Sequence, residues 1–224
     1  MGSLVRSAVM TVVAGCGLDA VGTLDAIPSE SGEGGVPEGG SLDGGSPDGS
    51  TIVLPPTGPP PCVVDVAARR RFTCAALASG KAWCFGDNSD GQLGDGTKTP
   101  RAAPTLVGGV TNAVRVATAS RMAYALTAAG KVWAWGLNDV GQLGDNSLMN
   151  HETPAEVPNF GGIDQLSAGR GHVCARSTAG DAYCWGWNIR GQIGDGLTGT
   201  NRKTPFKVPA QVTQVSAGGR HTAR

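Results

Sequence analysis

The sequence lacks an excess of charge of either sign, since 18 Lys and Arg residues balance 18 Asp and Glu residues. A neutral chain gives no electrostatic reason to expect a nucleic-acid or anionic-membrane partner, so we expect that the protein does not bind nucleic acid. It also lacks an apolar run long enough to cross a bilayer as a helix. The phosphate-binding pattern G-x-x-x-x-G-K-[ST] is absent, which removes the usual sequence evidence for a nucleotide site.

Glycine is abundant instead, at 36 of 224 residues, together with 14 prolines. That composition favours turns and loops over long helices. Aromatic residues make up only 5% of the chain, but they recur at repeated positions.

The N-terminus has the pattern of a targeting segment. Arg6 precedes a short apolar stretch, residues 8–14, that fits a signal peptide. The stretch ends in Val13-Ala14-Gly15-Cys16, which resembles a lipobox, with Val13 where Leu is most common. We expect a lipoprotein-type signal over residues 1–16 with lipidation of Cys16. An ordinary cleavable signal, or a chance apolar start, is the alternative.

Residues 17–61 are predicted to be a disordered linker. They are rich in Gly, Ser, Pro and acidic residues and hold few apolar side chains, so they cannot bury enough surface to offset their ordering entropy. The prolines just before Cys62 favour an extended approach to the folded part.

The folded part is a repeat with a period of 50 residues. Three segments align without gaps: GKAWCFGDNSDGQLGDG from Gly80, GKVWAWGLNDVGQLGDN from Gly130 and GDAYCWGWNIRGQIGDG from Gly180. An upstream element recurs from Val66, Val116, Leu166 and Val215. Three full units (62–111, 112–161 and 162–211) are therefore followed by a partial fourth, 212–224.

Within each unit the pattern is that of a β-strand. Residues 131–135 alternate small and large side chains with period 2. Both faces are apolar, which predicts sheets stacked with the bulky face of one on the small face of the next. Gly80, Gly130 and Gly180 close the expected hairpins with left-handed residues, and this register sets residue 74 opposite 84 and 174 opposite 184.

The signature G-[KD]-x-[WY]-x-[WF]-G-x-N-x-x-G-Q-[LI]-G-D-[GN], with the upstream A-G-x-x-H, closely resembles the repeat of the regulator of chromosome condensation family. The resemblance covers residues 63–224. It implies an all-β fold, a partial β-propeller of about three four-stranded blades plus a truncated fourth. Because the fourth unit stops inside a strand, we favour a truncated gene product over a ring closed by oligomerisation.

Four of the six cysteines are expected to form two disulfides. Cys74 and Cys84 recur ten apart as Cys174 and Cys184, and the second unit replaces both together with Tyr124 and Ala134. Opposed strand residues lie at a separation that a disulfide can bridge. A metal site is the rival interpretation, but no His joins both pairs, and we expect neither metal nor cofactor. Cys62 is then a free thiol or pairs with a partner missing from the truncated end.

The remaining recurring residues are interpreted as structural, because active sites rarely occur in triplicate. They are Gly86, Asn88, Gly91, Gln92, Gly94, Asp95, Gly136, Asn138, Gly141, Gln142, Gly144, Asp145, Gly186, Asn188, Gly191, Gln192, Gly194, Asp195, His172 and His221.

Three other features contain residue types that occur in binding or catalytic sites. Residues 87–91 lack the alternating acids of a calcium loop and are expected to form a polar turn. His151 is isolated in a loop. The basic run 69–71 is interpreted as a solvated loop, with contact to an acidic partner as the alternative.

No nucleophile, base and orienting acid form a recognisable set, so we expect a non-enzymatic protein-binding module. The most variable segments, 97–104, 146–154 and 197–205, are its expected binding loops. A non-functional fragment of a longer propeller, or a propeller hydrolase or lyase, are the alternatives, and guanine-nucleotide exchange is not expected. The protein is expected to be exported, held at the bacterial cell envelope by its lipid alone, and able to self-associate through open blade faces.

Overall fold

The computed structural model describes residues 62–223 of the chain. The predicted signal, the lipidation site Cys16 and the linker 17–61 lie outside the described residues. None of the described residues forms a helix that could cross a membrane.

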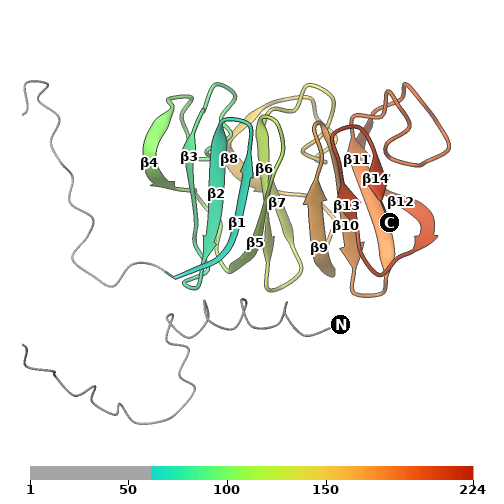
Figure 1. Ribbon diagram of the computed structural model, residues 1–224, viewed down its shortest axis with the longest axis horizontal. Helices are drawn as coiled ribbons and strands as arrows, with labels where there is room; N and C mark the ends of the chain where they lie inside the picture. The colour runs from blue at the N-terminus through green and yellow to red at the C-terminus, as the bar shows by residue number, and fades with distance from the viewer. Residues whose placement is uncertain (1–61, 224) are drawn as a thin grey trace, which may run out of the picture. The chain divides into compact units, whose positions relative to one another are not determined.

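The described residues form three four-stranded antiparallel sheets and one two-stranded ladder, as Figure 1 shows. The first sheet contains β1 (Val63–Arg69), β2 (Phe72–Leu77), β3 (Ala82–Gly86) and β4 (Arg101–Leu106). The second contains β5 (Ala113–Thr118), β6 (Met122–Thr127), β7 (Val132–Gly136) and β8 (His151–Glu156). The third contains β9 (Ile163–Ala168), β10 (His172–Ser177), β11 (Asp181–Gly186) and β12 (Arg202–Gln211), and the ladder pairs β13 (Ser216–Ala217) with β14 (Thr222–Ala223). The predicted all-β fold with three full blades and a partial fourth is confirmed.

Consecutive strands pair as neighbours in every sheet, in the register expected from the hairpin turns. Cys74 lies opposite Cys84, Tyr124 opposite Ala134, and Cys174 opposite Cys184. Gly80 closes its turn at a φ of 78°, a left-handed conformation that favours glycine. The hairpin turn therefore determines which face of the strands each side chain occupies.

The outer strand of each sheet carries a proline within it: Pro104 in β4, Pro154 in β8 and Pro205 in β12. Proline has no N–H to offer to another strand, so it is tolerated at a sheet edge and blocks edge-to-edge pairing there.

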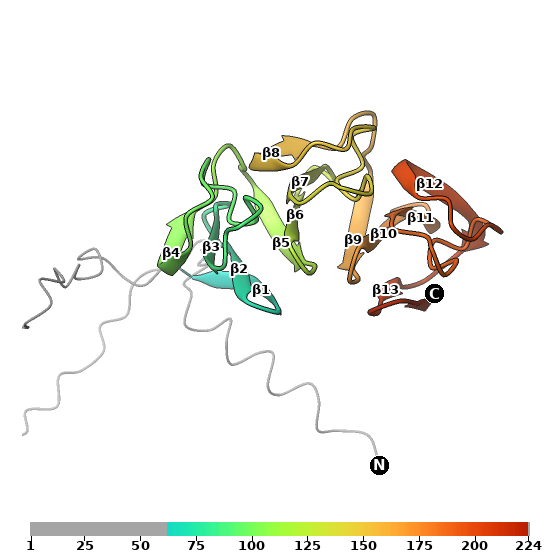
Figure 2. The same ribbon diagram turned by 90° about the horizontal axis from the view of Figure 1, so that it is seen from above.

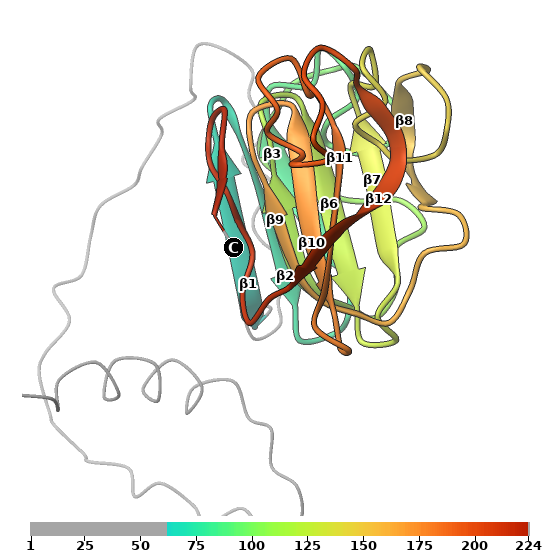
Figure 3. The ribbon, with the colours of Figure 1, turned by 90° about the vertical axis from the view of Figure 1, so that its right-hand side faces the viewer.

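The sheets pack face to face in chain order. The strands β1, β5, β9 and β13 lie along the inner side, and β4, β8 and β12 lie along the outer side (Figure 2). Seen from the side, the sheets lie one behind another (Figure 3). As predicted, the bulky face of one sheet packs on the small face of its neighbour. Trp133 and Trp135 of β7 pack against Cys74, Cys84 and other small residues of the first sheet.

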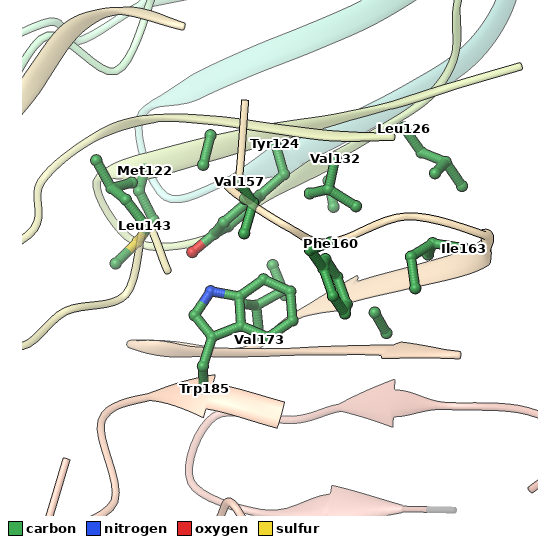
Figure 4. Packing of buried hydrophobic residues seen from close by; sticks show 14 of the residues in the cluster. Met122, Tyr124, Leu126, Val132, Leu143, Val157, Phe160, Ile163, Val173 and Trp185 are labelled. Atoms are coloured by element: carbon green, nitrogen blue, oxygen red, sulfur yellow. The ribbon is translucent and has the colours of Figure 1, made fainter. Parts of the chain in front are cut away.

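The packing of the third sheet on the second is centred on Trp185, which is fully buried. Figure 4 shows its indole beside Tyr124 and Phe160. Both neighbours meet it edge to face, with ring centroids 6.5 Å and 5.4 Å away. Burial of an aromatic side chain of this size stabilises the fold by about 2–3 kcal/mol.

The first sheet differs from the expectation that every third strand is buried on both faces. Phe85 of β3 is only half-buried, whereas Trp135 and Trp185 at the same position of the other two sheets are fully buried. The physical reason is that none of the described sheets packs against this face of the first sheet.

Both predicted disulfides are present. Cys74 is bonded to Cys84 and Cys174 to Cys184, and both pairs are fully buried. In the second sheet Tyr124 fills the place of the first cysteine and extends its hydroxyl to the main-chain oxygen of Gln142, 2.7 Å away. Cys62 is also disulfide-bonded, so the alternative of a free thiol at this position is wrong.

Removing one indole N–H tests the contact between sheets. Trp135 Nε1 donates to the main-chain oxygen of Gln92 (2.9 Å), which accepts from no other side chain of the described residues. The corresponding oxygen of Gln142 accepts from Trp185 (3.0 Å) and also from Tyr124. We expect Trp135→Phe to destabilise the fold by about 1–3 kcal/mol more than Trp185→Phe, because only the first change leaves a buried carbonyl without a side-chain partner. Urea unfolding of both variants measures the difference, and equal losses would contradict the assignment.

The disulfides are tested by replacing both members of a pair. We expect Cys74→Ala/Cys84→Ala to lower the free energy of unfolding by about 2–3 kcal/mol, because the short closed loop restricts the unfolded chain. The matched variant Cys174→Ala/Cys184→Ala should lose a similar amount, since the two loops are equally long. Urea unfolding under non-reducing conditions measures both, and unchanged midpoints would show that the bonds do not stabilise the fold.

Candidate binding surface

One end of the sheets carries most of the residues singled out in the sequence. We call it the loop rim, made of the segments after β3, β7 and β11 (87–100, 137–150 and 187–201) and the turns between the first two strands of each sheet (69–72, 119–122 and 169–172). These segments share one end because Phe72 pairs with Gly86, Met122 with Gly136, and His172 with Gly186. The longer segments appear at the top of Figure 1.

A buried asparagine organises each long segment of the loop rim. Asn88 Oδ1 accepts from the N–H of Leu93 (2.9 Å), and its Nδ2 donates to Asp95 Oδ1 (3.1 Å) and to the main-chain oxygen of Thr97 (3.0 Å). Asn138 and Asn188 accept from Leu143 and Ile193 in the same way, at 2.9 Å and 3.0 Å. One amide therefore holds both arms of the segment, which explains why the residue recurs.

The glutamine of the motif has two roles. Its side-chain oxygen accepts the N–H of the residue two positions earlier, at 2.8 Å in each of Gln92, Gln142 and Gln192. Its main-chain oxygen accepts a donor from the following sheet, which is an indole for the first two. For Gln192 the donor is the hydroxyl of Thr222, 2.8 Å away.

Two repeat glycines permit close approach that a side chain would prevent. Gly136 has a φ of 97°, and a Cβ there would lie 2.5 Å from the main-chain oxygen of Arg121. The N–H of Leu137 donates to this same oxygen, so the absence of a side chain at Gly136 lets the 119–122 turn approach closely enough to form the bond. At Gly144 a Cβ would lie 2.7 Å from the indole nitrogen of Trp185. Both positions therefore exclude any larger residue.

The recurring aspartates tie each segment to the start of the outer strand. Asp95 Oδ2 pairs with Arg101 Nε (2.9 Å), Asp145 with His151 Nε2 (3.1 Å), and Asp195 with Arg202 Nε (2.7 Å). Each also accepts the N–H of the residue two positions on, at Thr97, Ser147 and Leu197. His151 is thus the first residue of β8 and a partner of Asp145, so its interpretation as an isolated loop residue is wrong. A basic residue six or seven positions after each aspartate was the signal in the sequence.

The environment of Asp195 lowers the pKa of its carboxyl. Burial of this side chain, which has no exposed surface, raises the pKa. The hydrogen bonds from the Leu197 N–H, the Arg202 guanidinium and the Asn188 amide outweigh that effect. The pKa values of Asp95 and Asp145 are lowered by the same kinds of contact.

The segments also brace the sheets against one another. The N–H of Gly96 donates to the main-chain oxygen of Glu152 (3.0 Å), and the N–H of Asn146 to that of Lys203 (2.9 Å). Lys98 adds an ion pair to Glu152 at 3.2 Å. Each of the first two loops is therefore held by the outer strand of the next sheet.

The three predicted binding loops are only partly loops. Residues 101–104 belong to β4, 151–154 to β8 and 202–205 to β12. What remains outside the strands carries large apolar side chains in solvent. Leu148 is 55% exposed, Met149 73% and Leu197 48%, and the nearby Ile189 is 52% exposed.

Of the two predicted structural histidines, only His172 is buried. Its Nε2 lies 3.1 Å from Thr222 Oγ1, and burial lowers its pKa to about 4, so the ring is neutral at neutral pH. His221 is exposed. In the turn 87–91 the Asp87 carboxylate accepts the Ser89 N–H (3.2 Å). Residues 62–223 gather no group of three or more His, Cys, Asp or Glu side chains that could hold a metal ion.

Four-stranded antiparallel sheets repeat along the chain, and the loops after β3 and β7 bond each sheet to the next. This arrangement defines a propeller-type repeat protein. The model of the regulator of chromosome condensation (RCC1) repeat matches residues 79–126, 129–176 and 179–223, more than half of the chain. A second model of the same repeat matches residues 63–92 and 163–192. The chain belongs to the RCC1 repeat family.

Solved structures share this fold. The structure of yeast RCC1 (Prp20) bound to Kap60 is 23% identical with a TM-score of 0.63, covering 75% of this chain and 42% of that one. Human WBSCR16 is 20% identical with a TM-score of 0.55, covering 73% of this chain and 57% of that one. The chain thus spans about half the length of these proteins. A search of the curated proteins found no match.

Acid unfolding tests the role of the buried aspartate. Because the pKa of Asp195 is lower in the folded state, its contribution is complete above the ordinary carboxyl pKa and is lost as pH falls through the folded value. We expect Asp195→Asn to destabilise the fold at pH 7 by about 1.5–3 kcal/mol, since it removes charge-assisted hydrogen bonds. The difference in the free energy of unfolding between Asp195→Asn and the native chain should become smaller at acid pH.

Urea unfolding across the acid range measures this gap. Asp87→Asn is the control: its carboxylate accepts a bond at an exposed turn, and it should change stability at pH 7 by less than about 0.5 kcal/mol. A gap that stays constant with pH would contradict the role of the Asp195 charge.

Proposed function

We propose that this chain is a non-enzymatic protein-binding module whose loop rim contacts the partner. Propellers of this repeat are commonly protein-binding modules, and yeast RCC1 (Prp20) has been crystallised with the protein Kap60. Fold likeness alone assigns no partner to this chain. The proposal therefore depends on the surface itself.

The observation that carries the proposal is the exposure of large apolar side chains on a braced frame. Leu148, Met149 and Leu197 are about half exposed or more, within segments whose ends are held by buried asparagines and aspartates. Exposed apolar residues gathered on one surface are typical of protein-interaction sites. Loops that differ between repeats on a rigid scaffold are where recognition residues usually lie.

We further propose that the module acts outside the cytoplasm, anchored by lipidation of Cys16, which requires that the Cys16 thiol is not the disulfide partner of Cys62. The signal-like residues 1–16 and the acidic linker 17–61 support this placement. The two disulfides support it independently, because such bonds form and persist mainly in oxidising compartments. Metabolic labelling with a radioactive fatty acid tests the anchor: label on the native chain and none on Cys16→Ser is the expected result.

Capture of partners by the full chain tests the binding surface. Purified native chain serves as bait in an envelope extract of the source cells, and the captured protein is then titrated against variants. We expect Leu148→Ser/Met149→Ser to weaken that binding by at least about tenfold, because desolvated apolar anchors dominate interface energies.

The control is Leu106→Ser, which is 49% exposed but lies at the end of β4 away from the loop rim. It should bind as the native chain does, and all variants should keep the native thermal midpoint. Equal binding by native chain and rim variant, or loss only in the control, would contradict the proposal.

A further inference from the structure

An arginine recurs in the turn between the first two strands of every unit. The turns contain Arg70 with Arg71, Arg121, Arg170 and, in the partial fourth unit, Arg220. The last three turns are closed by the same main-chain bond, from Ala119 to Met122, from Gly169 to His172 and from Gly218 to His221. The first strands of all the sheets lie along the inner side of the stack, so these equivalent turns lie side by side on the inner part of the loop rim.

Three of these arginines line a single hollow of about 360 Å³, which we call the arginine hollow. Arg70 comes from the first sheet, Arg121 from the second and Arg170 from the third. The apolar part of the lining is Met122, Leu137, Val140 and Trp187. A smaller hollow beside it, of about 190 Å³, is lined by Arg70, Arg71 and Arg121.

The charge in this region is mostly not neutralised. Arg121 pairs with Asp90 at 3.4 Å, and its side chain remains 50% exposed. Among the described residues, Arg70, Arg71 and Arg170 take part in no ion pair or side-chain hydrogen bond. Asp139 is the acidic residue in the lining of the arginine hollow, and its Oδ1 accepts from the Gln142 amide (2.8 Å) instead of from an arginine.

Main-chain contacts hold the turns in place. The main-chain oxygens of Arg71, Arg121 and Gly171 accept the N–H groups of Asp87, Leu137 and Trp187 at 2.8–3.0 Å. Arg69 Nη1 also reaches from the first sheet to the main-chain oxygen of Ala168 in the third, 3.2 Å away. The free guanidinium groups are therefore carried on a fixed base, which lowers the entropy cost of binding.

The zero net charge of the chain conceals this feature. Residues 17–61 hold seven of the acidic residues and no Lys or Arg. Residues 62–224 hold 17 of the 18 basic residues but only 11 of the 18 acidic ones. The propeller part is thus basic, and the argument from neutrality against an anionic partner does not apply to it.

We infer that the arginine hollow binds an acidic peptide segment of a protein partner, with carboxylates on the arginines and an apolar side chain against Trp187. This inference rests on the proposed function and names the chemistry of the partner. Guanidinium groups bind carboxylates through paired hydrogen bonds, and arginine with tryptophan is the usual composition of a binding hot spot. The apolar lining favours a peptide over a polyphosphate backbone, because the backbone offers no apolar group to pack against it.

Fluorescence anisotropy on the full chain tests the site with a labelled peptide, Asp-Glu-Leu-Glu-Asp, and its uncharged counterpart, Asn-Gln-Leu-Gln-Asn. The acidic peptide should bind and the uncharged one should not. Arg121→Gln/Arg170→Gln should weaken binding by at least about tenfold, as expected for loss of charged hydrogen bonds.

The matched control is Lys81→Gln/Arg115→Gln, which removes the same net charge from exposed positions outside the hollow. It should leave binding within about twofold. Trp187→Ala alters no charge and should still weaken binding severalfold, with the thermal midpoint confirming that each variant is folded. Equal losses in the two double variants would show a general charge effect and overturn the site.

A single-stranded oligonucleotide tests whether the arginine hollow binds nucleic acid instead of an acidic peptide. Oligonucleotide binding as tight as that of the acidic peptide, and lost in the same variants, would overturn the peptide assignment. If the acidic peptide does not bind while Leu148→Ser/Met149→Ser still abolishes partner capture, the arginine hollow fails and the proposed function stands. If the peptide binds as described but the Leu148 and Met149 variant captures the partner normally, the arginine hollow stands and the outer loops fail.

Discussion

A buried indole N–H must find an acceptor, and in this protein the acceptor belongs to the preceding sheet. Trp135 donates to Gln92 and Trp185 to Gln142, each across 43 residues of chain. The side chain of the same glutamine closes its own turn, and the glycine two residues later leaves room for the indole. One repeated contact therefore couples the shape of each loop to the docking of the next sheet.

That coupling divides the loop rim into parts with different roles. The buried asparagines, glutamines and aspartates use their polar atoms on the chain itself, and this internal use explains their recurrence. The exposed residues between them have no such task. Leu148 and Met149 on the outer part are exposed, and the guanidinium groups of Arg70 and Arg170 on the inner part form no ion pair with the described residues. A partner would thus meet apolar groups outside and positive charge inside.

Much of the fold could be predicted from the sequence, because a repeat shows the same requirement three times. The small and large alternation in residues 131–135 and the glycine at each hairpin determined strand, register and both disulfides. The paired replacement by Tyr124 and Ala134 indicated a cross-strand contact even where the cysteines are absent. The pairing of His151 with Asp145 is hard to recognise in the sequence, because a histidine stands where the other units have arginine.

Local and periodic features can be predicted from the sequence alone: the strands, their turns, the paired cysteines and the residues that recur for structural reasons. Which exposed residues become neighbours depends instead on how the sheets pack. Arg70, Arg121 and Arg170 lie 51 and 49 residues apart in the sequence, and they line one hollow because the stacked sheets bring equivalent turns together. Net charge counted along a chain has no information about position, whereas binding depends on the distance between charges in space.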